Sequence, residues 1–135
     1  MSNASSAALS NVSPITCHVL DTTTGRPAAS LRVTLTLLQP SHGSPAFTAT
    51  TDADGRVKVW TKDADPSVGE VLRTAGDGAS QTIWALKFDT GNYFGDGKTF
   101  FPEVEVRFFV KTGPGEHYHV PLLLGPWSYT TYRGS

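Results

Sequence analysis

Cysteine is almost absent from this chain of 135 residues, and it has neither a long apolar run nor a block of like charges. The single cysteine, Cys17, has no second thiol to pair with, which excludes a disulfide-stapled secreted scaffold. No apolar run approaches the roughly 20 residues that cross a bilayer, so we expect no membrane partner. The 11 Lys and Arg residues are scattered among 12 Asp and Glu, which argues against nucleic acid as a partner.

The length fits one domain, because a chain of this size buries roughly two thirds of its unfolded surface. Residues 1–13 are rich in Ser, Ala and Asn, so we expect a disordered N-terminal arm followed by one domain over residues 14–135. The N-terminus lacks the charged-then-apolar layout of a signal peptide. The last residues are not Ser-Lys-Leu, so the cytoplasm is the expected compartment, with the peroxisome as the alternative.

Several short segments alternate apolar and polar residues with a period of two, which is typical of half-buried β-strands. Residues 31–37 do so most clearly, and their buried face is Leu31, Val33, Leu35 and Leu37. Further strands are expected at residues 15–20, 46–51, 56–60, 81–88 and 101–111, and in the C-terminal segment. Seven or eight short strands with regularly spaced turns predict an all-β, two-sheet β-sandwich.

The remaining segments are expected to be turns and loops, apart from one short helix. Asp89 is a capping residue followed by two aromatics, which predicts a helix of about two turns over residues 89–94, the only one in the chain. Residues 61–80 have few apolar anchors and are expected to form a long loop. In the strand that follows Asp54-Gly55, Val57 and Val59 should face the core.

The same alternation points three polar side chains away from the core. In residues 15–20 the apolar Ile15, Cys17 and Val19 share one face, which leaves His18 on the other. Arg56 and His119 are likewise predicted on the outer side of two other strands. Alternation alone does not bring these three side chains together.

Three segments, taken in order, nevertheless form a specific pattern. They are residues 15–28, ITCHVLDTTTGRPA; residues 51–56, TDADGR; and residues 117–135, HYHVPLLLGPWSYTTYRGS. This pattern resembles the 5-hydroxyisourate hydrolases, a family of enzymes related to transthyretin. The resemblance spans residues 15 to 135, which is nearly the whole chain.

The resemblance implies a transthyretin-like β-sandwich and an enzyme of urate degradation. Its substrate would be 5-hydroxyisourate, hydrolysed to 2-oxo-4-hydroxy-4-carboxy-5-ureidoimidazoline without a metal or another cofactor. The matching positions line one pocket, along a channel where two dimers of a homotetramer meet. The catalytic residues carried over are His18, Arg56, His119 and Ser135, and the substrate-binding residues are Tyr132, Arg133 and Gly134.

These residue types suit ring opening by water. A neutral imidazole can take the proton of water near neutral pH, and a second can protonate the departing ring nitrogen. The planar, permanently charged Arg56 can hold ring carbonyls and stabilise charge growing on oxygen. Ser135 can orient the water or fix a histidine tautomer. The sequence does not rank His18 against His119 as the base, and His117 is left between a flanking and a supporting role.

Two other classes of function remain open. One is a transthyretin-like carrier of a small apolar ligand, which would need mostly apolar pocket walls. The other is a plain interaction domain whose outward histidines are incidental. Leu38 and Phe109 are apolar residues predicted on outer faces, which suggests buried interfaces. The three tryptophans are expected to fill the core or an interface.

Overall fold

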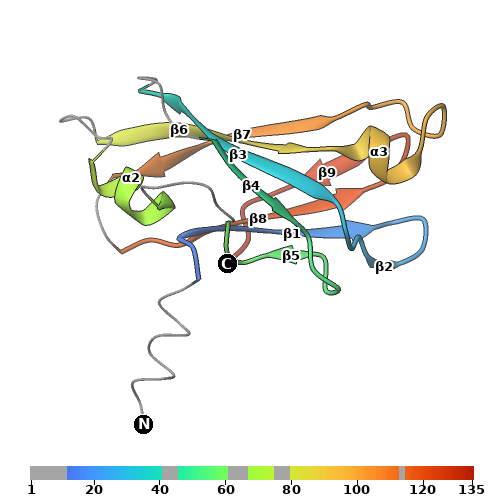
Figure 1. Cartoon of the computed structure of the whole chain (residues 1–135), viewed down its shortest axis with the longest axis horizontal. Helices are drawn as coiled ribbons and strands as arrows, with labels where there is room; N and C mark the ends of the chain where they lie inside the picture. The colour runs from blue at the N-terminus through green and yellow to red at the C-terminus, as the bar shows by residue number, and fades with distance from the viewer. Residues whose placement is uncertain (1–11, 41–45, 61–66, 75–79, 113–114) are drawn as a thin grey trace, which may run out of the picture.

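The computed structural model describes residues 12–40, 46–60, 67–74, 80–112 and 115–135, and they form two packed β-sheets (Figure 1). The arm predicted for residues 1–13 therefore lies mostly outside the described residues. The strands are β1 (Ile15–Asp21), β2 (Arg26–Pro27), β3 (Arg32–Gln39), β4 (Ala46–Thr50), β5 (Arg56–Val57), β6 (Gln81–Phe88), β7 (Val104–Lys111), β8 (Tyr118–Leu124) and β9 (Tyr129–Thr131). The predicted sandwich is confirmed, with five strands in one sheet and four in the other.

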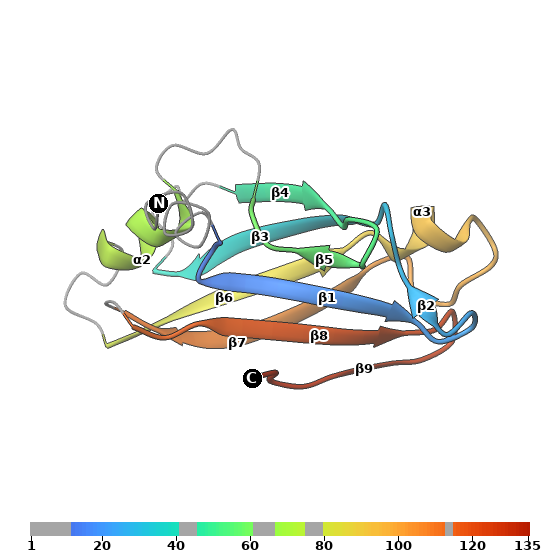
Figure 2. The ribbon, with the colours of Figure 1, turned by 90° about the horizontal axis from the view of Figure 1, so that it is seen from below.

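The five-stranded sheet has the order β2-β1-β8-β9, and β5 also pairs with β1. Strands β1 and β8 run parallel, with Thr16 opposite His119, although about 100 residues separate them in the chain. Strand β9 then returns antiparallel along β8, so the C-terminus lies below the middle of this sheet in Figure 2. The first and last long strands of the chain are thus neighbours.

The four-stranded sheet, of order β4-β3-β6-β7, is antiparallel throughout. Its inner face presents the predicted residues of β3 and β6 to the core, and Val33, Leu35, Trp84, Leu86 and Phe88 are fully buried. From the opposite sheet Ile15, Cys17 and Val19 pack against them, also fully buried. Burying an aliphatic or aromatic side chain of this size contributes roughly 1.5–3 kcal/mol, so this alternation supplies most of the driving force for the sandwich.

Within the described ranges, helices α2 and α3 lie at opposite ends of the sandwich in Figures 1 and 2, so the prediction of a single helix is wrong. Helix α2 (Val68–Thr74) falls within the predicted loop 61–80. Ser67 and Glu70 cap its first turn reciprocally, since the Glu70 N–H donates to Ser67 Oγ (3.3 Å) and the Ser67 N–H donates to Glu70 Oε1 (3.1 Å). Its buried residues, Val68, Val71 and Leu72, have helical spacing.

Helix α3 (Thr90–Phe94) confirms the helix predicted over residues 89–94, although it is shorter than two turns. Asp89 precedes it without capping it, because its carboxylate accepts from Asn92 Nδ2 instead (2.7 Å). The Tyr93 hydroxyl donates to Asp21 Oδ2 (2.8 Å), which ties the helix to the end of β1. The helix therefore covers the end of the sandwich away from α2.

Strand β5 ends earlier than predicted, at Val57. Val57 is buried as expected, but Val59 is 54% exposed, so the prediction that Val59 faces inward is wrong. The alternation stops because the chain leaves the strand after Val57 and buries Trp60 instead, whose Nε1–H donates to the Ile15 carbonyl (2.9 Å). The expected strand opening at Phe101-Pro102 likewise begins later, at Val104.

None of the helices in the described ranges is long and apolar enough to cross a membrane.

Candidate active site

Strands β1, β5 and β8 bring the three predicted polar residues together on the outer face of the five-stranded sheet. His18 pairs with Arg56 in the antiparallel register of β1 and β5. The parallel register of β1 and β8 places His119 opposite Thr16, one outward position before His18. The His18 and His119 rings come to 6.3 Å between centroids. The turn at Asp54-Gly55 is tight, with Gly55 at φ +75°, and it leads directly into Arg56, which pairs with His18.

The C-terminal tail completes the same face. The Gly134 N–H donates to the His119 carbonyl (2.8 Å), and Thr131 Oγ1 donates to the Pro121 carbonyl (2.8 Å), so the tail is fastened to β8 at two points. Ser135 then lines a hollow of about 330 Å³ together with Arg56, His117 and His119. The hollow thus contains the imidazoles of His117 and His119, the Arg56 guanidinium and Ser135. His18 is not among its lining residues and lies beside it, next to His119.

Thr16, which the sequence pattern does not single out, links His119 on β8 to His117, the residue just before that strand. Thr16 Oγ1 lies 2.8 Å from His119 Nδ1 and 3.1 Å from His117 Nε2. The rings of His117 and His119 are stacked, with centroids 6.3 Å apart. The available signal was the strand period, because Thr16 lies two residues before His18 and shares its outward face. His117 belongs to this cluster through Thr16.

The electrostatic environment favours the neutral form of both central imidazoles. Burial lowers the pKa of His119, and the charges of Arg56, His117 and His18 lower it further. Burial and the Arg56 charge also lower the pKa of His18, partly opposed by a hydrogen bond to the Asp54 backbone. A neutral imidazole has a free ring nitrogen, so either group can accept a proton near neutral pH.

Cys17 lies beneath this hollow, but its thiol is unreactive. Its side chain is fully buried, and burial raises the pKa of the thiol to about 12. The thiol therefore stays protonated at neutral pH, as a core residue would.

Tyr132 and Arg133 are not among the residues that line the hollow of Ser135. The Arg133 guanidinium stacks over the Tyr118 ring at 4.7 Å and pairs with Glu116 at 3.2 Å. Both Tyr132 and Arg133 line a neighbouring hollow of about 370 Å³, which His119 shares. The predicted tail residues therefore surround His119, with Ser135 in one hollow and Tyr132 and Arg133 in the next.

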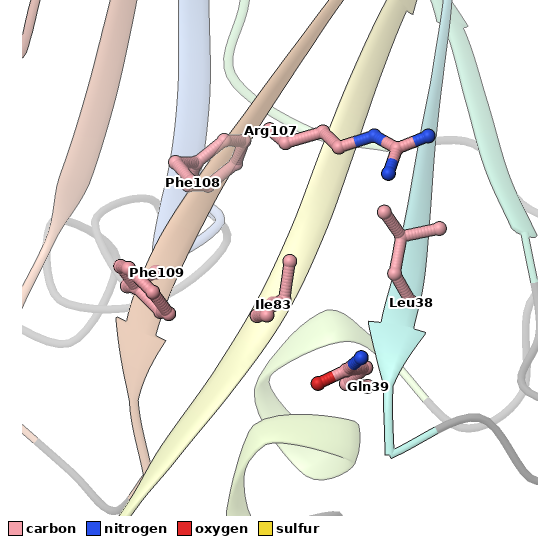
Figure 3. A pocket seen from close by; sticks show the side chains of 6 residues that line it. All are labelled: Leu38, Gln39, Ile83, Arg107, Phe108 and Phe109. Carbon is pink, nitrogen blue, oxygen red and sulfur yellow. The ribbon is translucent and has the colours of Figure 1, made fainter.

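Another hollow, of about 450 Å³, lies on the outer face of the four-stranded sheet (Figure 3). It contains Leu38, Ile83 and Phe109 from three adjacent strands, and Figure 3 shows the Arg107 side chain reaching across above them. Arg107 Nε donates to Glu105 Oε2 (2.7 Å), and the lining residues include no general acid or base. This apolar surface is therefore a poor candidate for hydrolysis. In the part of the chain that is described, no three His, Cys, Asp or Glu side chains gather as a metal site.

Comparison with known proteins identifies the family of this chain. The model of the family described as "Transthyretin: HIUase/Transthyretin family" matches residues 15–134. The chain belongs to this family. Among HIUase/transthyretin proteins, the probable 5-hydroxyisourate hydrolase of Schizosaccharomyces pombe is 44% identical over 126 residues, which cover 90% of each chain.

Solved structures of the HIUase/transthyretin family share the fold. The Klebsiella pneumoniae 5-hydroxyisourate hydrolase superposes with a TM-score of 0.64 at 25% identity, covering 90% of this chain and 98% of that one. Sea bream transthyretin in complex with thyroxine superposes with a TM-score of 0.66 at 25% identity, covering 90% and 94%. The family resemblance and the transthyretin-like fold predicted from the sequence are confirmed, and the fold alone suits both an enzyme and a carrier.

Proposed function

We propose that this protein hydrolyses 5-hydroxyisourate in urate degradation. The observation that carries the proposal is a hollow lined by Arg56, His119 and Ser135, with His18 beside His119 and paired with Arg56. Several relatives of the chain are named as 5-hydroxyisourate hydrolases. A carrier of an apolar ligand needs mostly apolar walls. Neutral imidazoles beside a guanidinium suit proton transfer instead.

In the proposed reaction His119 is the general base. Its Nδ1 is held by Thr16, and its Nε2 has no hydrogen-bond partner among the described residues, so Nε2 can take a proton from water. The water oxygen then bonds to a carbonyl carbon of the six-membered ring, and the C–N bond of that ring breaks. The departing nitrogen receives the proton that His119 took from water, and the carboxylic acid that forms loses its remaining proton to leave a carboxylate. His18, whose pKa is also lowered and whose ring centroid lies 6.3 Å from that of His119, can accept this proton of the carboxylic acid.

Arg56 supplies the positive charge of the site. Its charge already acts on both imidazoles, which lowers their pKa values. When water adds to the carbonyl carbon, negative charge grows on the carbonyl oxygen, and a fixed guanidinium stabilises that charge more than it stabilises the neutral substrate. We therefore assign substrate orientation and transition-state stabilisation to Arg56.

The tail completes the substrate site in this proposal. Ser135 positions the water or the substrate from within the hollow, while Tyr132, Arg133 and Gly134 form the wall beside His119. We extend the proposal to a homotetramer built from two dimers. Its support is the large exposed apolar side chains, which an assembly would cover: Phe100, Phe109, Trp127 and Tyr132 are between 57% and 71% exposed.

Turnover of freshly generated 5-hydroxyisourate, followed against its spontaneous decay, tests the function. Replacing His119 with Ala should lower kcat by about 10²–10⁴-fold, the usual contribution of a general base, without unfolding the protein. Arg56→Gln should also lower activity, whereas the matched exposed arginine on the other sheet, Arg32→Gln, should leave it unchanged. A wild-type protein that does not accelerate the decay refutes the hydrolase. Light scattering of the same sample gives its oligomeric state.

A further inference from the structure

The hydroxyl of Thr16 lies between two imidazoles and has only one proton to share. Thr16 is 4% exposed, and its Oγ1 is within hydrogen-bond distance of both His119 Nδ1 (2.8 Å) and His117 Nε2 (3.1 Å). A hydroxyl donates one hydrogen bond and accepts two. When both rings are neutral, one ring must therefore accept the Thr16 proton and the other must donate its own N–H to Thr16.

Two arrangements satisfy this rule. In the first, Thr16 donates to His119 Nδ1, so His119 has its proton on Nε2 and has no lone pair free for a substrate or water. In the second, Thr16 donates to His117 Nε2 and accepts from His119 Nδ1–H, which leaves Nε2 of His119 bare. The tautomers of His117 and His119 are thus coupled through a single buried oxygen.

We propose that Thr16 and His117 are positioning residues that hold His119 in the tautomer with a bare Nε2. The inference rests on the proposed function of His119 as the base. When Nε2 takes a proton, Nδ1–H already donates to Thr16, so the imidazolium forms without rearrangement of its partners. His117 is exposed, so water can satisfy its second ring nitrogen, and it can accept the Thr16 proton at little cost.

This coupling gives Thr16 and His117 a role that works through His119. A threonine oxygen could bond either nitrogen type and does not fix a tautomer by itself. The acceptor Nε2 of His117 on the far side decides the direction in which the Thr16 proton points. The three groups resemble the base and its orienting partner in serine hydrolases, where a wrong tautomer alone removes most of the catalysis.

The tautomer of His119 can be read directly from nitrogen–proton correlation spectra of ¹⁵N-histidine-labelled protein, at a pH where the imidazoles are neutral. The wild type and Thr16→Ser, which keeps the hydroxyl, should both show His119 protonated on Nδ1. Thr16→Val should lose this signature, and its kcat should fall by about 10–100-fold with little change in KM, since only part of the general-base contribution is lost. Thr36→Val on β3, in the other sheet, is the matched control and should change neither reading.

His117→Phe provides a second test that spares the buried position. Without an acceptor on that side, the Thr16 hydroxyl should turn to His119 Nδ1, so the His119 proton should move to Nε2 and kcat should fall. A wild-type spectrum with the proton on Nε2 would overturn the proposal, as would a Thr16→Val protein with unchanged tautomer and unchanged kcat. Absence of turnover in the wild type would instead overturn the hydrolase function, because the spectra do not depend on substrate.

Discussion

Gly134 lies so close to His119 that a single added methyl group should disturb the site. A Cβ at Gly134 would lie 2.8 Å from His119 Cδ2 and 3.0 Å from Pro121 Cγ. Carbon atoms in ordinary contact are about 3.5–4.0 Å apart, so the His119 ring or the tail must move by about 0.7 Å or more. The Gly134 backbone is not in the left-handed region, so this steric contact is the main effect of Gly134→Ala.

A displacement of that size matters more to catalysis than to folding. Misplacing a catalytic group by about 1 Å can cost about 10²-fold in rate, so we expect kcat/KM of Gly134→Ala to fall by about 10–100-fold. The tail lies at the edge of the sheet and can shift outward, so the cost in stability should stay below the roughly 1–3 kcal/mol of overpacking in a closed core.

The assay is turnover of 5-hydroxyisourate above its spontaneous decay, with thermal unfolding measured on the same samples. Gly69→Ala in α2 is the matched control, because its nearest foreign atom, Arg73 Nη1, is 3.9 Å from the new Cβ. That variant should keep full activity. A Gly134→Ala protein as active as the wild type would refute the close packing of the tail on His119 as a requirement of the site.

Three further predictions concern pH, the core and the tail. Because the pKa of His119 is lowered and only its neutral form accepts a proton, the acid limb of kcat/KM should lie below the ordinary histidine value of about 6.5, and a midpoint at or above that value would contradict the assignment. Thr51→Val should lower the free energy of unfolding by about 1–3 kcal/mol in chemical denaturation, because the buried Leu31 N–H that donates to Thr51 Oγ1 (2.9 Å) loses its acceptor. Glu116→Gln removes the charge that pairs with Arg133, so the tail should become more susceptible to carboxypeptidase, and equal digestion of both proteins would argue against this tether.

The strands of the core could be predicted because their burial follows the simplest rule of a sheet. In β3 and the residue before it, every second residue from Leu31 to Leu37 is buried, and the sequence shows the same period. The rule failed at Val59, because the two-residue β5 ends at Val57 and the large ring of Trp60 fills the core instead. A strand end set by one aromatic side chain is a tertiary effect that alternation does not contain.

Helix α2 was missed although its signal was local. Ser67 followed by Glu70 is a capping box, and the apolar residues after it have helical spacing. Surrounding Asp, Pro, Gly and Ser residues drew attention to a loop instead. The capping box and the apolar spacing therefore predict the helix better than the composition of the wider segment does.

The site was predictable only in part. Alternation placed His18 and Arg56 on outer faces, but their meeting depends on the pairing of β1 with β5 and β8, which no local pattern specifies. Family resemblance supplied that pairing. Neither alternation nor family resemblance predicted the hydrogen bond between Thr16 and His117. The two residues are 101 positions apart, and their contact depends on the exact register of two parallel strands.

The parallel pairing of β1 with β8 has a consequence for folding during synthesis on the ribosome. Ribosomes release a chain from its N-terminus, so His18 and Arg56 emerge long before His119 and the tail. Contacts between such distant segments form late and slowly in folding. A nascent chain can therefore assemble one sheet early, but it gains its chemistry only when the final strands have left the tunnel and closed beside the first.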